Sequence, residues 1–251
     1  MSALLHFGRF EMLRLIRSWK FLLITVGFPV TFYMLFLGDR RSGEVVAAGS
    51  VTWREYLMVA MCSFGCLVAG LTAGGGRLAA ERVGGWARQL RVTPLPTWSY
   101  VMVKTATSML VMLPVIVLVE VVSAGFGDVR LAAGRWIELT LVMWVTGLPF
   151  AELGVLIGFV AGVETAFPVI TALMFVLGYF GGLFNPVSAM PSPLRTAAHL
   201  LPSFHGAAAG LSVVDGRPAG VTDWLILAGY AVGLSALVAW RHRTEEMKGL
   251  A

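Results

Sequence analysis

One apolar run, REYLMVAMCSFGCLVAGLTAGGG (residues 54–76), is long enough to cross a lipid bilayer as a helix. A helix needs about 20 mainly apolar residues to span the hydrocarbon core. Five further runs of this kind occur, and tryptophans stand at or beside the ends of most of them, as an interfacial aromatic belt requires. The sequence therefore predicts an all-α integral membrane protein with six transmembrane helices, at about residues 19–38, 54–76, 98–122, 136–160, 165–185 and 221–240.

The composition favours a single membrane domain that covers residues 1–251. Hydrophobic residues make up 57% of the chain and charged residues 13%. That charged share is about half of the roughly 25% found in soluble domains. The formal net charge is +5, but the basic residues are spread along the chain beside apolar runs, which favours a role in membrane orientation over nucleic-acid binding.

The basic residues also predict the orientation of the chain. Six spans put both termini on one side of the membrane, and the connections on that side carry twelve Lys and Arg against seven on the other. Cytoplasmic connections carry the excess of Lys and Arg in multi-pass proteins. We therefore expect a cell-membrane protein with both termini in the cytoplasm.

Two segments outside the spans have patterns of their own. Residues 1–18 place basic side chains on one helical face and leucines on the other, which predicts an interfacial helix, with a plain cytosolic lead-in helix as the alternative. Residues 186–220 are moderately apolar but interrupted by Pro191, Pro193 and Pro202, which predicts an outer re-entrant helical hairpin between spans 5 and 6. Residues 19–185 then hold spans 1–5, and residues 221–251 hold span 6 and a cytoplasmic tail.

Known catalytic and cofactor motifs are missing from the sequence. No phosphate-binding loop of the G-x-x-x-x-G-K-[ST] type occurs, so we expect the chain to bind no nucleotide itself. The four histidines are scattered, which argues against a metal site, and His199 and His205 are expected to serve packing or hydrogen bonding. Cys62 and Cys66 lie four residues apart in an apolar run, where packing is the favoured interpretation. No catalytic, cofactor or metal residues are predicted.

Carboxylates inside the apolar runs are the more informative polar residues. Glu152 lies well inside the fourth run, where an ionised carboxylate is costly and usually faces protein or a water-filled path. Glu152 is therefore the candidate polar residue of a transport pathway. The alternative is a structural hydrogen bond to a Thr or Trp of a neighbouring span. Glu120 and Glu138 lie nearer the outer boundary, where they can face headgroups or each other.

The connection between spans 2 and 3, RLAAERVGGWARQLRVTPLPT (residues 77–97), is longer than two antiparallel helices need. Its start favours a helix, Gly84 and Gly85 permit a change of direction, and Pro94 prevents continuation into the third span. The pattern predicts a short helix along the membrane that exposes Glu81, Arg82, Arg88, Arg91 and Trp86.

These residues resemble a known family, the permeases of type-2 ABC exporters, which includes daunorubicin-resistance exporters. The family's loop after the second span reads approximately E-x-x-x-G-[T]-x-x-x-L-x-x-[T]-P-[L], followed by a Lys about ten residues later. That pattern is matched here by Glu81, Gly84 or Gly85, Leu90, Thr93, Pro94, Leu95 and Lys104. A second signature, after the fifth span, is matched by Gly181, Gly182, Phe184, Pro186, Met190, Pro191 and Pro202. The sequence departs from the pattern at Trp86 and at Ser203-Phe204.

The resemblance implies a transport subunit and not an enzyme. Its fold would present a cytoplasmic coupling helix, residues 81–93, to a separate ABC ATPase that binds ATP and Mg²⁺. Two ATPase copies and a second permease chain, either identical or a paralogue, would complete a bacterial exporter of amphipathic drugs, natural products or lipid-like molecules, in the manner of multidrug efflux and antibiotic resistance. The implied coupling residues are Glu81, Arg82, Gly84, Gly85, Trp86, Arg88, Leu90, Arg91, Thr93 and Pro94. The implied outer re-entrant gate consists of Phe184, Pro186, Met190, Pro191 and Pro202.

Other interpretations of the sequence stay open. The arginines of residues 77–97 can bind anionic headgroups and determine topology without a protein partner. The chain can be an ion-coupled or passive carrier without an ATPase, in which Glu152 acts as a proton relay. A membrane-embedded enzyme is a third class, but no convergent set of catalytic side chains is evident.

Overall fold

The computed structural model describes residues 14, 17–38, 45, 50–83 and 97–248. Within this part of the chain the regular structure is helical, apart from one isolated β-bridge. The predicted interfacial helix (residues 1–18) lies almost wholly outside the described residues, and so does the connection 84–96.

Six helices of the described chain are long and apolar enough to cross a membrane, so this is a multi-pass membrane protein. They confirm the number and approximate places of the predicted spans. The second span is longer than predicted, because its helix continues to Arg82 instead of ending at residue 76. The candidate spans are Trp19–Leu37, Trp53–Arg82, Tyr100–Phe126, Ala133–Val160, Val163–Phe180 and Val221–Arg241.

Two spans are assembled from more than one helical element. The second is divided by a π-helical turn, and the fourth is interrupted at Gly147. The elements of the spans are α2 (Trp19–Leu37), α3 (Trp53–Gly70), η1 (Leu71–Gly76), α4 (Arg77–Val83), α6 (Thr97–Phe126), α7 (Ala133–Thr146), α8 (Leu148–Val160), α9 (Val163–Phe180) and α12 (Val221–Lys248).

Helix α3 is the centre of the bundle. It begins with a capping box, in which the Thr52 main-chain N–H donates to Glu55 Oε2 at 2.8 Å and the Glu55 N–H donates to Thr52 Oγ1 at 3.5 Å. Its residues are buried on nearly all sides by α2, α6, α8 and α11 (Pro202–Asp215). Because it is buried all round, α3 has no polar face, as its continuous apolar sequence indicates. Cys62 and Cys66 are free thiols inside this core, which confirms the packing interpretation.

Glycines bring the second and fourth spans into backbone contact. A Cβ atom added at Gly154 of α8 would lie 2.2 Å from the Gly70 carbonyl oxygen, and one added at Gly75 would lie 2.8 Å from the Gly154 oxygen. Gly74 faces the same stretch of α8. Small residues allow such close approach between transmembrane helices, where van der Waals packing replaces the hydrophobic effect. This glycine seam, defined as Gly70, Gly74, Gly75 and Gly154, joins η1 to α8.

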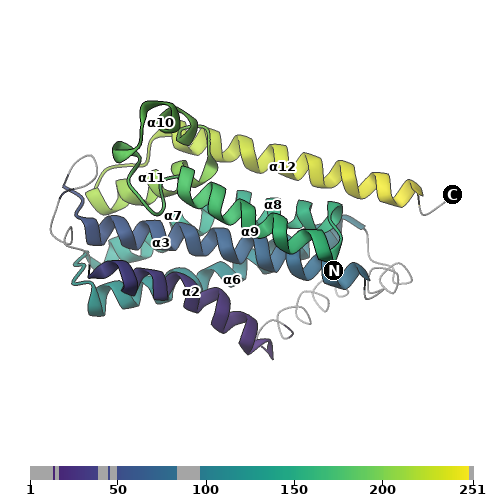
Figure 1. The fold of residues 1–251 in the computed structure, drawn as a ribbon, viewed down its shortest axis with the longest axis horizontal. Helices are drawn as coiled ribbons and strands as arrows, with labels where there is room; N and C mark the ends of the chain where they lie inside the picture. The colour runs from purple at the N-terminus through teal and green to yellow at the C-terminus, as the bar shows by residue number, and fades with distance from the viewer. Residues whose placement is uncertain (1–13, 15–16, 39–44, 46–49, 84–96, 249–251) are drawn as a thin grey trace.

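The segment between spans 5 and 6 contains three short helical elements, η2 (Val187–Ala189), α10 (Ser192–Ala198) and α11. Helix α11 is mostly buried among α3, α7 and α12, whereas α10 lies at the edge, beside the end of α9 (Figure 1). The segment is helical in these three places, and the re-entrant hairpin that dips into the membrane stays a prediction.

A carboxylate at the end of α11 holds the connection that precedes α3. The Ser50 main-chain N–H and hydroxyl each donate to Asp215 Oδ1 at 3.0 Å. These hydrogen bonds, together with the nearby charge of Arg217, hold the pKa of Asp215 below its ordinary value. The α10–α11 end of the bundle is thus linked to the start of the central helix.

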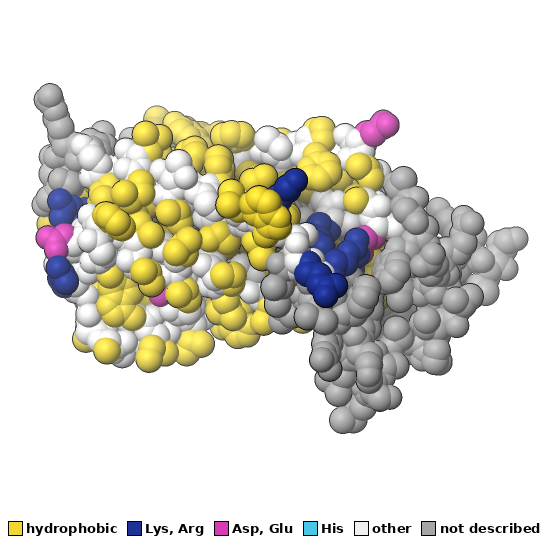
Figure 2. All heavy atoms as spheres, turned by 90° about the horizontal axis from the view of Figure 1, so that it is seen from below, with side chains coloured by type: hydrophobic (Ala, Val, Ile, Leu, Met, Phe, Trp, Pro, Cys, Tyr) yellow, Lys and Arg dark blue, Asp and Glu magenta, His cyan; other side chains and the backbone are white. Residues whose placement is uncertain are grey.

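The outer surface of the bundle is apolar. In Figure 2 hydrophobic side chains are spread along the described face, while most Lys, Arg and acidic side chains lie toward its two ends. Helices α2, α9 and α12 expose most of their length, including Leu35, Phe175 and Val232. An apolar band between charged ends is the distribution that a bilayer requires.

We expect Gly154→Ala to destabilise the fold, because its Cβ atom has no room beside Gly70. Overpacking of this kind costs about 1–3 kcal/mol. The matched control is Gly229→Ala on α12, where no atom lies within 4 Å of the added Cβ. Thermal unfolding of the detergent-purified chain measures both variants, and equal melting temperatures would contradict the seam.

Candidate coupling site at the end of the second span

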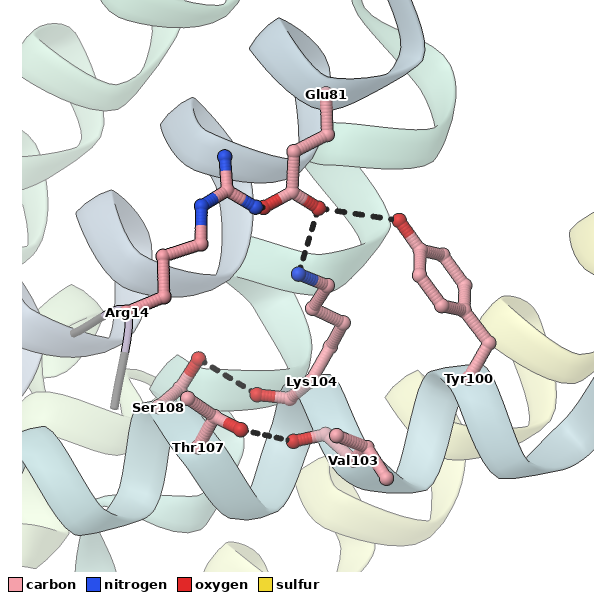
Figure 3. Close-up of polar contacts among 7 residues, drawn as sticks. All are labelled: Arg14, Glu81, Tyr100, Val103, Lys104, Thr107 and Ser108. Carbon is pink, nitrogen blue, oxygen red and sulfur yellow. Dashed lines mark hydrogen bonds and ion pairs between the residues drawn. The ribbon is translucent and has the colours of Figure 1, made fainter. Parts of the chain in front are cut away.

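Glu81 occupies the last turn of α4, directly before the connection 84–96, and lies inside the protein. Its Oε2 atom is 2.6 Å from Lys104 Nζ, and its Oε1 atom accepts a hydrogen bond of 2.8 Å from Arg14 Nη1. The Tyr100 hydroxyl donates to Oε2 at 3.4 Å (Figure 3). One carboxylate is therefore surrounded by two cations and a phenol. We call Arg14, Glu81, Tyr100 and Lys104 the charged cluster.

The lysine of the cluster is positioned by α6. Lys104 exposes 3% of its surface, and its ammonium group lies 5.5 Å from the centre of the Tyr100 ring. Tyr100 and Lys104 are four residues apart, so both project from the same face of α6. One turn further, the hydroxyls of Thr107 and Ser108 donate to main-chain carbonyls of their own helix (Figure 3). Such internal bonds satisfy hydroxyl groups within an apolar span.

Burial makes the pairing of these charges obligatory. The side chains of Glu81 and Lys104 are only 3% and 4% exposed. An isolated charge at such depth is strongly unfavourable, and removal of one partner of a buried pair costs about 3–5 kcal/mol. The ends of α4 and α6 are therefore held together by an electrostatic contact that depends on both residues.

The prediction that Glu81 is exposed is wrong, and Arg82 is half-buried instead of fully exposed. Glu81 faces Lys104 inside the bundle, and Arg82 Nη1 donates to the carbonyl oxygens of Gly158, at 3.0 Å, and Phe159. These carbonyls belong to the last turn of α8, where a cation is favourable because helix C-termini carry a partial negative charge. Sequence reasoning assigned both side chains to the connection, whereas the structure turns them back onto the bundle.

The charged cluster links the residues on either side of the connection 84–96. Glu81 precedes this segment and Lys104 follows it, so their ion pair joins its two ends. The remaining predicted coupling residues lie outside the described residues; they are Gly84, Gly85, Trp86, Arg88, Leu90, Arg91, Thr93 and Pro94. Their contacts and their helical form stay predictions.

Sequence reasoning missed two members of the cluster. Tyr100 could have been found from its spacing of four residues to Lys104 on one helix. Arg14 is 67 residues from Glu81, and no local pattern signals that contact.

The second predicted polar site, Glu152, lies between α8 and α12. Its Oε1 atom accepts a hydrogen bond from the Ser235 hydroxyl, and its buried Oε2 atom has no hydrogen-bond partner within the described residues. The partner is a serine of the sixth span, not the Thr or Trp considered from the sequence. Glu120 is bonded to Thr140 at 2.7 Å, while Glu138 is exposed, so the two do not face each other.

The predicted gate residues differ in how deeply they are buried. The Phe184 ring packs against Phe64 of α3, with a centroid distance of 4.9 Å, and against Phe32 of α2, at 6.0 Å. Met190 is buried, whereas Pro191 is exposed. Pro186 and Pro202 are both buried, and Pro202 begins α11, a position that tolerates a residue without an N–H.

Comparison with known proteins defines the class. The profile of the ABC-2 family transporter proteins matches residues 47–240, so the chain belongs to this family of membrane permeases. It is a transport component and not an enzyme, and membership of the family implies an ATPase partner. A relative in Bacillus subtilis (strain 168), named "Putative transport permease YvfS", is 27% identical over 236 residues, which cover 94% of this chain and 95% of the relative.

We expect Glu81→Gln to lower the melting temperature strongly, because it leaves Lys104 buried beside a neutral partner, at a cost of about 3–5 kcal/mol. The double variant Glu81→Gln, Lys104→Met removes both charges and should recover much of that loss. The control is Arg130→Gln, which breaks an exposed ion pair with Asp128 and should cost less than about 1 kcal/mol. A double variant less stable than Glu81→Gln would contradict the pairing.

Proposed function

We propose that this chain is the membrane-spanning subunit of an ATP-driven exporter, which moves an amphipathic substrate out of the cell while a separate ATPase binds ATP and Mg²⁺. The observation that carries the proposal is the buried Glu81–Lys104 pair in a member of the ABC-2 family. The pair ties both ends of the connection 84–96 to the helix bundle. If an ATPase bound to this segment moves, the anchored segment can transmit the displacement to the second and third spans.

A path for that movement runs through rigid contacts. Helices α4, η1 and α3 form one continuous helical span, so a displacement at Glu81 is carried along the second span. The glycine seam then joins that span to α8, and Arg82 joins α4 to the end of the same helix. Close-packed helices transmit displacement because they have little free volume to absorb it.

The orientation with cytoplasmic termini is supported by the place of the basic residues. The end of α12 and the end of α4 lie at the same end of the bundle in Figure 1. Arg14 and Lys104 meet Glu81 at this end, and Arg77 stacks on Phe21 near the start of α2, at 5.2 Å from the ring centre. We assign this end to the cytoplasm, where Lys and Arg are enriched.

The complex would contain two permease chains, identical or paralogous, and two ATPase copies. The exposed apolar faces of α2, α9 and α12 are available for lipid and for the second permease. Transported molecules would be amphipathic drugs, natural products or lipid-like compounds, and efflux of a drug would confer resistance. Phe184, Met190 and the prolines beside them would form the outer gate.

We expect the double variant Trp86→Ala, Arg88→Glu to release the ATPase, because it removes an apolar anchor and reverses a docking charge. Native permease purified from its host membranes should retain ATPase chains, and the double variant should insert normally but retain at least tenfold fewer. The matched control, Arg130→Glu in the connection between α6 and α7, should retain the ATPase. Unchanged association in the double variant would overturn the coupling assignment.

We expect Glu152→Gln to impair transport more than folding, because it removes the carboxylate charge that we propose faces the pathway. Gln keeps an oxygen that can accept from Ser235, so the melting temperature should change little. Uptake of a fluorescent amphipathic dye by inverted vesicles measures transport, and Ser235→Ala tests the hydrogen bond alone. Normal uptake by Glu152→Gln would return this residue to a structural role.

A further inference from the structure

The start of α2 carries basic side chains that no acidic residue of the described chain neutralises. Arg17 and Lys20 are both exposed, and within the described residues neither forms an ion pair. The nearby carboxylate of Glu81 is already shared by Arg14 and Lys104. The start of α2 therefore presents uncompensated positive charge to its surroundings.

Basic residues at the opposite end of the bundle are compensated within the protein. Arg130 Nη2 lies 3.0 Å from Asp128 Oδ1, and Arg217 pairs with Asp215. In Figure 2 several basic side chains gather toward one end of the described face, beside a group of hydrophobic side chains. Like charges repel unless a counter-charge lies between them, so the uncompensated charge favours an anion from outside the chain.

Aromatic side chains indicate the depth of these basic groups in the membrane. Trp19 is 63% exposed, and the Lys20 ammonium group lies 5.9 Å from the centre of its ring. Exposed tryptophans of membrane proteins lie at the level of the lipid headgroups. Arg77 of α4 stacks on Phe21, so a third basic side chain reaches the same turn from the second span. The basic groups are therefore placed where phosphate groups of lipids occur.

An apolar stripe continues along α2 from the basic residues. The helix buries Thr25 and Pro29 against the bundle, and its helical period places Lys20, Ile24 and Gly27 on the opposite face. Ile24 is 69% exposed, and a Cβ atom added at Gly27 would meet no atom within 4 Å. A cationic position followed by open apolar surface matches a molecule with an anionic head and a hydrocarbon tail.

We propose that Arg17, Lys20 and Arg77 form a binding surface for an anionic phospholipid, with its phosphate against the basic side chains and an acyl chain along Ile24 and Gly27. Free phosphate shares the headgroup chemistry, but only a lipid also covers the apolar stripe. Zwitterionic lipids carry a cation beside the phosphate, so the surface selects lipids with net negative charge. Because Arg77 belongs to the second span, one headgroup joins spans 1 and 2.

Native mass spectrometry of the full chain in a non-ionic detergent tests this surface. The probes are phosphatidylglycerol and phosphatidylcholine with identical acyl chains. The unmodified chain should bind phosphatidylglycerol at least tenfold more tightly than phosphatidylcholine. The double variant Arg17→Gln, Lys20→Gln should weaken phosphatidylglycerol binding about thirtyfold, because each basic residue beside an anionic lipid surface contributes about 1 kcal/mol. Its phosphatidylcholine binding should change less than about twofold.

Two control variants separate this surface from net charge and from folding. Arg130→Gln, Arg217→Gln removes the same charge at the other end of the bundle and should change phosphatidylglycerol binding less than about twofold. Arg17→Lys, Lys20→Arg keeps both charges and should retain the affinity. The side chains of Arg17 and Lys20 are exposed, so all three double variants should melt at similar temperatures in lipid-free detergent.

Three results would overturn the proposal. The first is equal affinity of the unmodified chain for the two lipids, and the second is an equal loss of phosphatidylglycerol binding in both glutamine double variants. The third is displacement of phosphatidylglycerol by millimolar inorganic phosphate, which would assign the basic residues to a free anion. Transport and ATPase binding enter none of these measurements, so their outcome is independent of the proposed exporter function.

Discussion

The glycine seam between η1 and α8 is the contact on which the rest of the bundle depends. Without side chains at Gly70, Gly74 and Gly154, the backbones of the second and fourth spans approach closely enough to exclude any added Cβ atom. In a bilayer the helices gain nothing from hiding apolar surface, so such close packing must supply the stabilisation. The π-helical turn at η1 brings consecutive glycines onto this contact. Helices α6, α9 and α11 then pack around the pair.

The position of the second span in the glycine seam also determines where the Glu81 carboxylate lies. Because α4 continues the same helix, Glu81 enters the bundle at its end instead of pointing away from it. Lys104 and Arg14 neutralise this carboxylate, and Arg82 satisfies the last carbonyls of α8. The charged cluster therefore lies where the second and third spans meet. The connection 84–96, which the family would present to its ATPase, begins and ends beside it.

Much of the fold was accessible from the sequence, and the site was accessible only in part. Apolar run lengths predicted six spans because each helix satisfies its own backbone hydrogen bonds in lipid, so length and hydropathy carry the signal. Glu81 and Lys104 both belong to the family pattern. The exposure of Glu81 was nevertheless predicted wrongly, and the ion pair between the two residues was not predicted. Arg14 carried no signal, because a contact across 67 residues depends on how helices pack.

The sequence alone determined that the chain is a six-span membrane protein, that its basic residues are unequally distributed and that it resembles the ABC-2 permeases. Only the tertiary structure decided that Glu81 is buried with Lys104, that Glu152 bonds to Ser235 and that His205 joins α10 to α12. Hydropathy is a property of each segment by itself. The hydrogen-bond or ion-pair partner of a polar side chain depends on the distance and direction between helices. These arise from the close packing of small residues on several helices at once.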